Sequence, residues 1–300
     1  MKINPSLDDH IDMVFVRAKK LIELEYWDNI TQRELEHWIQ NFKSREEKYL
    51  AAAILHTLIF RNRKSIKTLG ENIFHIILPQ LLEEHDIFKI DSICNWLKLL
   101  KSNRARSTLK IRFSAIDDID DKAVKSSSTI LSELKGKFFD GTLSVNSHNL
   151  SEHVTKGVNT FIFFDDIIGT GEQFDRFFQK RNLDKLNARI IYIPFAAIPN
   201  SINSLEKKYK NLIIHPVEII EPAHSFFCES NDFLKYADEL TPQQFKDFYL
   251  TLCKSKKINI NGNLGVGGLE LTYVFSSSTP NNNLAMLMHK NDDWSGLFTR

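Results

Sequence analysis

The first hundred residues carry hydrophobic side chains at helical spacing. Thr31 with Glu34, and Ser44 with Glu47, have the S/T-x-x-E spacing of a capping box, whose side chains satisfy the free amides at a helix start. Apolar residues between positions 49 and 59 form the broad stripe of a packed helix. A further helix is expected to kink or end at Pro79, because proline has no amide hydrogen to donate. The pattern predicts an all-helical N-terminal domain over residues 1–104.

After residue 109 short β-rich runs alternate with helical ones. The expected strands cover 109–114, 159–164, 188–193, 212–216 and 269–275, and the expected helices cover about 126–138, 172–180, 201–210 and 241–253. This alternation is typical of βαβ units, and continuous apolar strands such as 160–164 suit a sheet that is covered on both faces. The sequence therefore predicts an α/β domain over residues 105–300 with an open, mostly parallel sheet, whose ligands bind at the carboxyl ends of the strands.

Composition and charge exclude several classes of protein. The chain has 300 residues, of which 42% are hydrophobic and 26% charged, which is ordinary for a globular protein and excludes fibrous and disordered classes. The formal net charge of +1 gives no whole-chain attraction to nucleic acid or to an anionic membrane. The apolar runs are too short to span a bilayer, and the three cysteines are widely spaced, as in reduced cytosolic proteins. We expect a cytoplasmic protein with no membrane partner.

A local basic run lies between the two predicted domains. It consists of Lys98, Lys101, Arg104, Arg106, Lys110 and Arg112. Such a cluster is more commonly a solvated linker, and a contact with nucleic acid or phosphate is the alternative.

The segment from Thr160 to Phe174 carries the clearest chemical signal. An apolar strand runs into Asp165 and Asp166, and a Gly169-Thr170-Gly171 turn then leads into a helix. The amides of the turn and of the helix start, together with the threonine hydroxyl, can hold a phosphate. The two carboxylates can accept hydrogen bonds from ribose hydroxyls, directly or through a divalent cation. The arrangement predicts a binding site for a sugar phosphate.

Three alternative roles for this segment agree less well with its residues. A Walker A loop needs a lysine after its second glycine, and none follows Gly171. A dinucleotide-binding fingerprint needs a third glycine, where Phe174 stands here. Acids that merely cap the next helix would account for one aspartate, but not for two that close an apolar strand.

The order of four hydrophobic residues, Asp-Asp, two hydrophobic residues, a small residue and Thr-Gly resembles the phosphoribosyl diphosphate (PRPP) motif of type I phosphoribosyltransferases. More narrowly, the chain resembles the phosphoribosyltransferase-like proteins of bacterial conflict and phage-defence loci, including retron-associated effectors. This resemblance covers residues 109–300 well and the helical portion loosely. Its further elements are Lys125-Ser126-Ser127, Thr279-Pro280-Asn281-Asn282 and the ending Trp294-Ser-Gly-Leu297-Phe298.

The resemblance implies a role for each residue of the motif. Asp165 and Asp166 would meet the ribose diol and hold Mg²⁺. The 5′-phosphate would lie on Gly169, Thr170 and Gly171, and the diphosphate on Lys125 and Ser126. Glu172 and Gln173 depart from the family, which usually has a small residue and then threonine or serine there.

The resemblance also implies a function for the whole chain. It would be a phosphoribosyltransferase-like effector that acts on PRPP or a related ribose 5-phosphate nucleotide in antiviral defence, by Mg²⁺-assisted transfer at the anomeric carbon. The alternative is a non-catalytic nucleotide-sensing or partner-binding module on the same fold. In that case the N-terminal helical domain would pass occupancy of the site to a protein or ribonucleoprotein partner.

Overall fold

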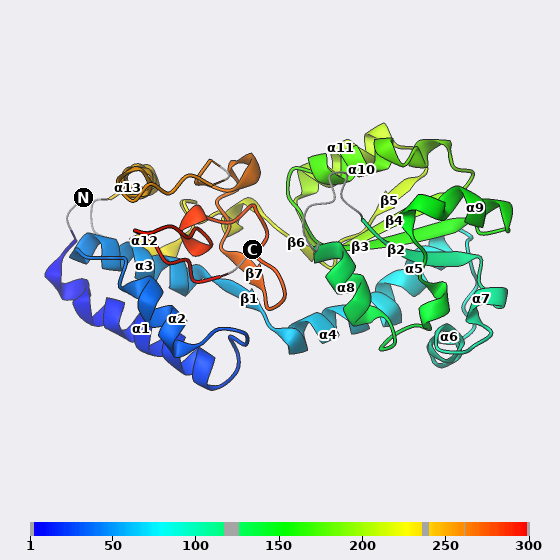
Figure 1. Ribbon diagram of the computed structural model, residues 1–300, viewed down its shortest axis with the longest axis horizontal. Coiled ribbons are helices and arrows are strands. Elements are labelled where there is room, and N and C mark those ends of the chain that lie inside the picture. Colours follow the sequence, from blue (N-terminus) through cyan, green and yellow to red (C-terminus); the bar gives the residue numbers. More distant parts are fainter. Residues whose placement is uncertain (1–2, 117–125, 236–239, 261, 299–300) are drawn as a thin grey trace. The chain divides into compact units, whose positions relative to one another are not determined.

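The computed structural model describes residues 3–116, 126–235, 240–260 and 262–298 (Figure 1). The chain forms two compact units. We call residues Lys64–Ile220 the sheet unit, and Met1–Arg63 with Glu221–Arg300 the terminal unit. Among the described residues, no helix combines the length and the apolar character needed to cross a membrane.

The sheet unit contains a five-stranded parallel sheet. Its strands are β2 (Ile111–Ala115), β3 (Thr160–Ile168), β4 (Arg189–Ala197), β5 (Leu212–Ile214) and β6 (Glu218–Ile219). The order is β2-β3-β4-β5, and β6 continues β5 along the same edge of β4, since Leu212 pairs with Ile190 and Glu218 with Ala196. The predicted α/β class with an open parallel sheet is confirmed, together with a helical N-terminal region.

Two layers of helices cover this sheet (Figure 1). On one face lie α10 and α11, where the Phe174 ring stacks on Tyr192 with centroids 4.0 Å apart. On the other face lie α4, α5 and α8, and there Phe74 packs against Phe113 and Phe164. Three further helices, α6, α7 and α9, lie at one end of the sheet unit (Figure 1). The bounds of these helices are Arg63–Asn72 (α4), Leu78–Glu84 (α5), Ile93–Leu100 (α6), Ala105–Thr108 (α7), Ser126–Leu134 (α8), Leu150–Thr155 (α9), Glu172–Lys180 (α10) and Pro199–Lys208 (α11).

The terminal unit joins the two ends of the chain in one core. Its strands β1 (Ile59–Arg61) and β7 (Tyr273–Phe275) form a parallel pair. The indole nitrogens of Trp38 and Trp294 both donate to the Met286 carbonyl oxygen, at 2.8 and 3.1 Å. Its helices are α1 (Asp8–Glu23), α2 (Gln32–Ile39), α3 (Arg45–Thr57), α12 (Asp232–Lys235) and α13 (Pro242–Ser255).

Most of the predicted helices and strands lie near their expected positions, but the short strands β1 and β6 were not predicted and two of the predicted strands differ. The predicted strand 269–275 pairs with β1 in the terminal unit and lies outside the large sheet. The predicted strand 159–164 extends to Ile168, because Ile167 and Ile168 continue its apolar run and pair with Ala196 and Ala197. The domains 1–104 and 105–300 stay a prediction, since compact units need not coincide with domains that fold alone.

Candidate functional site

The acidic pair lies inside β3, near the carboxyl end of the strand. Asp165 pairs with Pro194 of β4, and β3 continues for three residues beyond it. The exposed fractions of Asp165 and Asp166 are only 5% and 7%. The expectation that these two acids close the apolar strand is therefore wrong, because Ile167 and Ile168 extend the strand beyond them.

Both oxygens of the Asp165 carboxyl group accept hydrogen bonds from the protein. Oδ1 accepts from the Ser126 hydroxyl and from the Asp166 amide, each at 3.0 Å, and Oδ2 accepts from the Tyr192 hydroxyl at 2.9 Å. Burial, and next the charge of Asp166, raise the pKa of Asp165 well above its ordinary value. Burial also raises the pKa of Tyr192. Asp165 is thus held by α8 and β4, which suits a positioning residue.

Asp166 is directed to the other side of β3, because successive side chains of a strand point to opposite faces. Its Oδ1 accepts a hydrogen bond from the Ile167 amide at 2.8 Å. The two carboxylates therefore differ in their hydrogen-bond partners, although they are adjacent in the sequence.

The Gly169-Thr170-Gly171 turn follows β3 and leads directly into α10. Gly171 is the N-cap of α10 and has φ +81°, a left-handed conformation that glycine adopts without strain. The Gly169 carbonyl accepts a hydrogen bond from the Ser201 hydroxyl, and the Thr170 hydroxyl oxygen accepts one from the Glu172 amide at 3.4 Å. The side chains of Glu172 and Gln173 are exposed. The turn and the start of α10 lie where the sequence placed a phosphate site, and their role in binding a phosphate stays a prediction.

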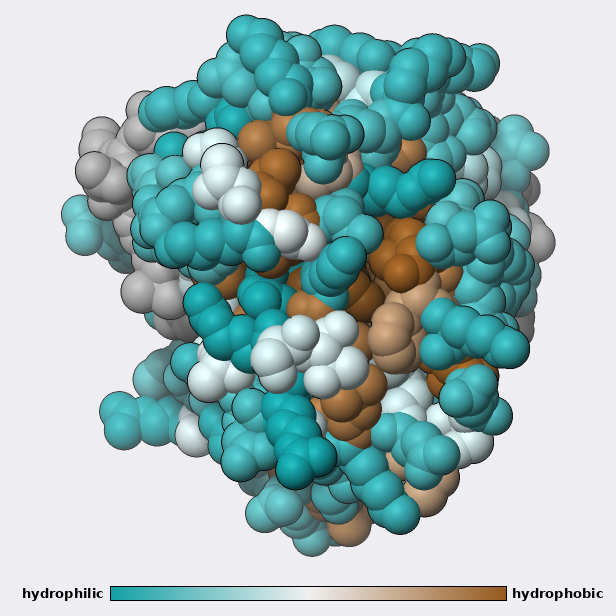
Figure 2. Space-filling model, turned by 90° about the vertical axis from the view of Figure 1, so that its right-hand side faces the viewer, coloured by the Kyte–Doolittle hydropathy of each residue, from teal (hydrophilic) through white to brown (hydrophobic). Residues whose placement is uncertain are grey.

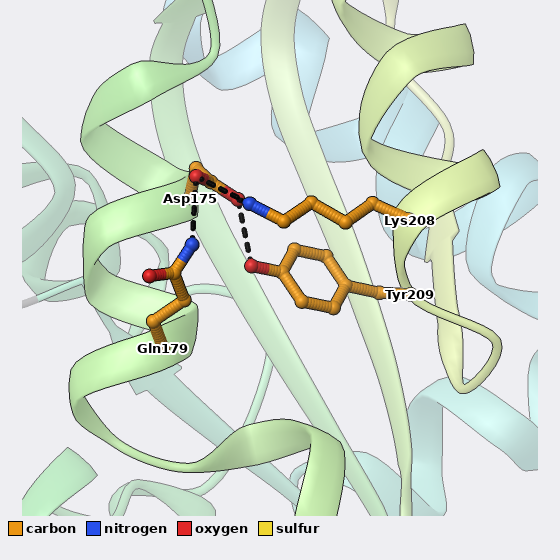
Figure 3. A network of polar contacts seen from close by, with 4 residues as sticks. All are labelled: Asp175, Gln179, Lys208 and Tyr209. Carbon is orange, nitrogen blue, oxygen red and sulfur yellow. Dashed lines mark hydrogen bonds and ion pairs between the residues drawn. The ribbon is translucent and has the colours of Figure 1, made fainter.

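A polar network fixes α10 against α11 (Figure 3). The Asp175 carboxylate accepts hydrogen bonds from Lys208 at 2.7 and 2.8 Å, from the Tyr209 hydroxyl at 2.7 Å and from Gln179 at 3.0 Å. Burial acts to raise the pKa of Asp175, but the hydrogen bonds from Lys208 and Tyr209 outweigh it and lower the pKa. This network fixes the position of α10, the helix that follows the Gly169-Thr170-Gly171 turn.

The remaining predicted residues lie on α8 or just before it. Ser126 begins α8 and contacts Asp165, so the structure brings these two together. Lys125 lies outside the described residues. In the part of the chain that the structure describes, no three histidine, cysteine or acidic side chains gather as a metal site.

Tyr192 was missed from the sequence, and Ser127 was noted there only as part of the Lys125-Ser126-Ser127 element, without a role. Tyr192 has the only hydroxyl group in the apolar run 190–193, and this is the signal that could have marked it. Ser127 is 1% exposed and joins β2 to β3, because its hydroxyl donates to the Phe164 carbonyl at 2.6 Å and accepts from the Ile116 amide at 2.7 Å. A serine inside a helix gave no signal of this role.

Comparison with known proteins identifies the family. No curated protein matches the sequence. The model of the PRTase-CE family matches residues 35–300, which include the acidic pair, the turn and most of the N-terminal helices. The chain therefore belongs to the PRTase-CE family, which is phosphoribosyltransferase-like and associated with conflict systems.

Proposed function

We propose that this phosphoribosyltransferase-like protein acts on PRPP or a related ribose 5-phosphate nucleotide in antiviral defence. One observation carries the proposal: the Gly169-Thr170-Gly171 turn joins the carboxyl end of the inner strand β3 to the start of α10. Ligands of open α/β sheets bind at this edge, and a helix start attracts phosphate.

Each residue of the motif has a role in this proposal. The amides of the turn and the Thr170 hydroxyl bind the 5′-phosphate, and Asp166 accepts hydrogen bonds from the ribose diol. Asp165 is a positioning residue, because its oxygens are already engaged by Ser126 and Tyr192. Lys125 and the backbone amide of Ser126 bind the diphosphate, since the Ser126 hydroxyl donates to Asp165.

Mg²⁺ fits this proposal through Asp166 rather than through the acidic pair. The ion is commonly bound by one or two carboxylates together with substrate phosphates, so a cage of protein ligands is not required. Asp165 does not fit as a ligand, because each of its oxygens accepts a hydrogen bond from the protein. When bound, Mg²⁺ would neutralise charge on the departing diphosphate.

The proposed reaction is transfer at the anomeric carbon of the ribose. The bond from this carbon to the diphosphate oxygen breaks, its electron pair leaves with the diphosphate, and a nucleophile bonds to the carbon. Positive charge develops on the sugar and negative charge on the leaving group. The chain contributes by fixing the 5′-phosphate on the turn and by placing amides and cations near the leaving group.

A second candidate function is ligand sensing without transfer. It is favoured by the contacts of Asp165, whose two carboxyl oxygens already accept hydrogen bonds from Ser126, Asp166 and Tyr192. This leaves Asp166 alone to contact a ligand, where the family resemblance implies that both acids do so. In this case the N-terminal helices would report occupancy to a protein or ribonucleoprotein partner.

The two functions are separated by incubating the purified full chain with PRPP, Mg²⁺ and a mixture of nucleobases and nucleotides. We expect release of diphosphate by the wild type and its loss in Asp166→Asn. Binding of PRPP without release, also when a co-purifying partner is present, supports the sensor. Absence of PRPP binding by the folded protein contradicts both functions.

A further inference from the structure

A basic pocket of about 440 Å³ lies in the sheet unit, away from the acidic pair. We call it the Arg112 pocket. Its polar lining consists of Asn103, Arg106, Ser107, Arg112, His153 and Lys156.

The fold places this pocket at the amino edge of the sheet. Arg112 is the second residue of β2, and the other lining residues come from the segments that precede β2 and β3. These strands begin side by side, with Ile111 paired to Thr160. The Asn159 amide also donates to the Lys110 carbonyl at 3.0 Å. Because the strands are parallel, the Gly169-Thr170-Gly171 turn lies at the opposite edge. Figure 2 shows the end of the sheet unit where α7 and α9 lie; hydrophilic residues surround a hydrophobic area near the centre of this face.

Arg112 is a buried charge for which the described part of the chain supplies no carboxylate partner. Its exposed fraction is 6%. Its guanidinium group donates to three main-chain carbonyls, those of Leu109 and Ile111 at 2.7 Å and that of Arg106 at 2.9 Å. Its Nε is buried and has no hydrogen-bond acceptor among the described residues. Burying a charge is costly unless an opposite charge compensates for it, and carbonyl dipoles do this only in part.

The surrounding side chains add positive charge. Arg106 is exposed and donates to the Thr142 carbonyl, and Lys156 pairs with Glu152 on the surface. The half-buried His153 has its pKa lowered by burial first, and next by the charges of Arg106, Arg112 and Lys156. The pocket therefore has an excess of basic groups that an anion would stabilise.

We propose that the Arg112 pocket binds the phosphate group of a small phosphorylated ligand. The planar guanidinium of Arg106 matches phosphate oxygens in a bidentate manner, and Ser107 and Asn103 offer further polar groups. The pocket has a larger volume than a phosphate group alone, so it has room for part of the molecule that carries the phosphate. This site is independent of the ribose 5-phosphate site at the other edge.

The test uses inorganic phosphate and adenosine 5′-monophosphate as probes on the full chain. The NMR titration of the His153 ring reports on this pocket, and calorimetry measures affinity. We expect each probe to raise the pKa of His153, because an adjacent anion favours the imidazolium form. Arg106→Gln should weaken this binding about tenfold, because it removes one charge-assisted contact with the phosphate.

Two control variants make the result specific. Lys210→Gln removes a surface charge elsewhere in the sheet unit and should leave the affinity unchanged. Gly171→Ala disturbs the turn at the carboxyl edge and should leave the His153 response intact, so failure of the two sites can be told apart. The proposal is overturned if saturating phosphate and nucleotide leave the His153 pKa unchanged, or if Arg106→Gln binds as tightly as the wild type. Binding of a single-stranded oligonucleotide, but of neither small probe, also overturns it.

Discussion

Replacement of Asp165 by asparagine tests whether this residue positions the site or binds the ligand. Asparagine keeps an oxygen that accepts from the Ser126 hydroxyl and from the Asp166 amide. Its amide group can donate to the Tyr192 hydroxyl oxygen, which lies 2.9 Å from Oδ2 in the wild type. The substitution therefore preserves the contacts and removes a buried carboxyl group that lies beside a second one.

The expected effect on stability depends on pH in a direction that the structure fixes. Burial and the charge of Asp166 raise the pKa of Asp165 in the folded protein, whereas an unfolded aspartate titrates at about 3.9. Between these two pKa values the native state retains a proton that the unfolded state has lost, so the free energy of unfolding of the wild type falls as pH rises. Each unit by which the folded pKa of Asp165 exceeds its unfolded pKa lowers the free energy of unfolding by about 1.4 kcal/mol at high pH. Asp165→Asn has no carboxyl group at this position and should not show this decrease.

Urea unfolding of both proteins between about pH 4 and pH 8 measures this difference. We expect Asp165→Asn to gain stability relative to the wild type as pH rises, and to bind PRPP with nearly unchanged affinity. A stability difference that is constant over this range, or that changes in the opposite direction, would refute the assigned charge state. Loss of PRPP binding in the folded variant would refute the positioning role.

Three other substitutions test neighbouring parts of the site. Tyr192→Phe removes the donor to Asp165 Oδ2 and should lower the free energy of unfolding by about 1–3 kcal/mol in urea titrations; no loss would mean that the bond does not stabilise the core. Gly171→Ala should lower the free energy of unfolding by about 1–2 kcal/mol and weaken PRPP binding, because Gly171 has φ +81° and a Cβ atom there would lie 3.1 Å from Leu205. The control Gly136→Ala has a similar φ of +77° and no neighbour within 4 Å, and it should retain binding. Glu172→Gln removes an exposed charge beside the turn, so it should strengthen PRPP binding in calorimetry at low salt and less so at high salt, whereas equal affinities would show that Glu172 does not repel the phosphate.

Local patterns predicted those parts of the fold that depend on neighbouring residues. The Thr31 and Glu34 capping box forms as expected, with both hydrogen bonds present. Pro79 lies in the first turn of α5, two residues after the end of a π-helical turn over Ile73–Ile77, so the regular α-helical hydrogen bonding changes close to the proline, where a kink or an end was expected.

Long-range pairing could not be read from local patterns. The pairing of β7 with β1 joins residues that are more than two hundred positions apart, and no periodicity encodes such a partner. The same limit applies to the acidic pair. The sequence marked Asp165 and Asp166 as a candidate site, but their different environments depend on Tyr192 and Ser126, which reach Asp165 only through the folded sheet.

The most direct test of the central claim is calorimetric titration of PRPP with Mg²⁺ into the full chain and into Asp166→Asn. We expect the wild type to bind and Asp166→Asn to bind at least about tenfold more weakly, equivalent to about 1.4 kcal/mol, while circular dichroism shows an unchanged fold. Equal affinities of the two proteins, or no binding by the wild type, would contradict a ribose 5-phosphate site at the carboxyl end of β3.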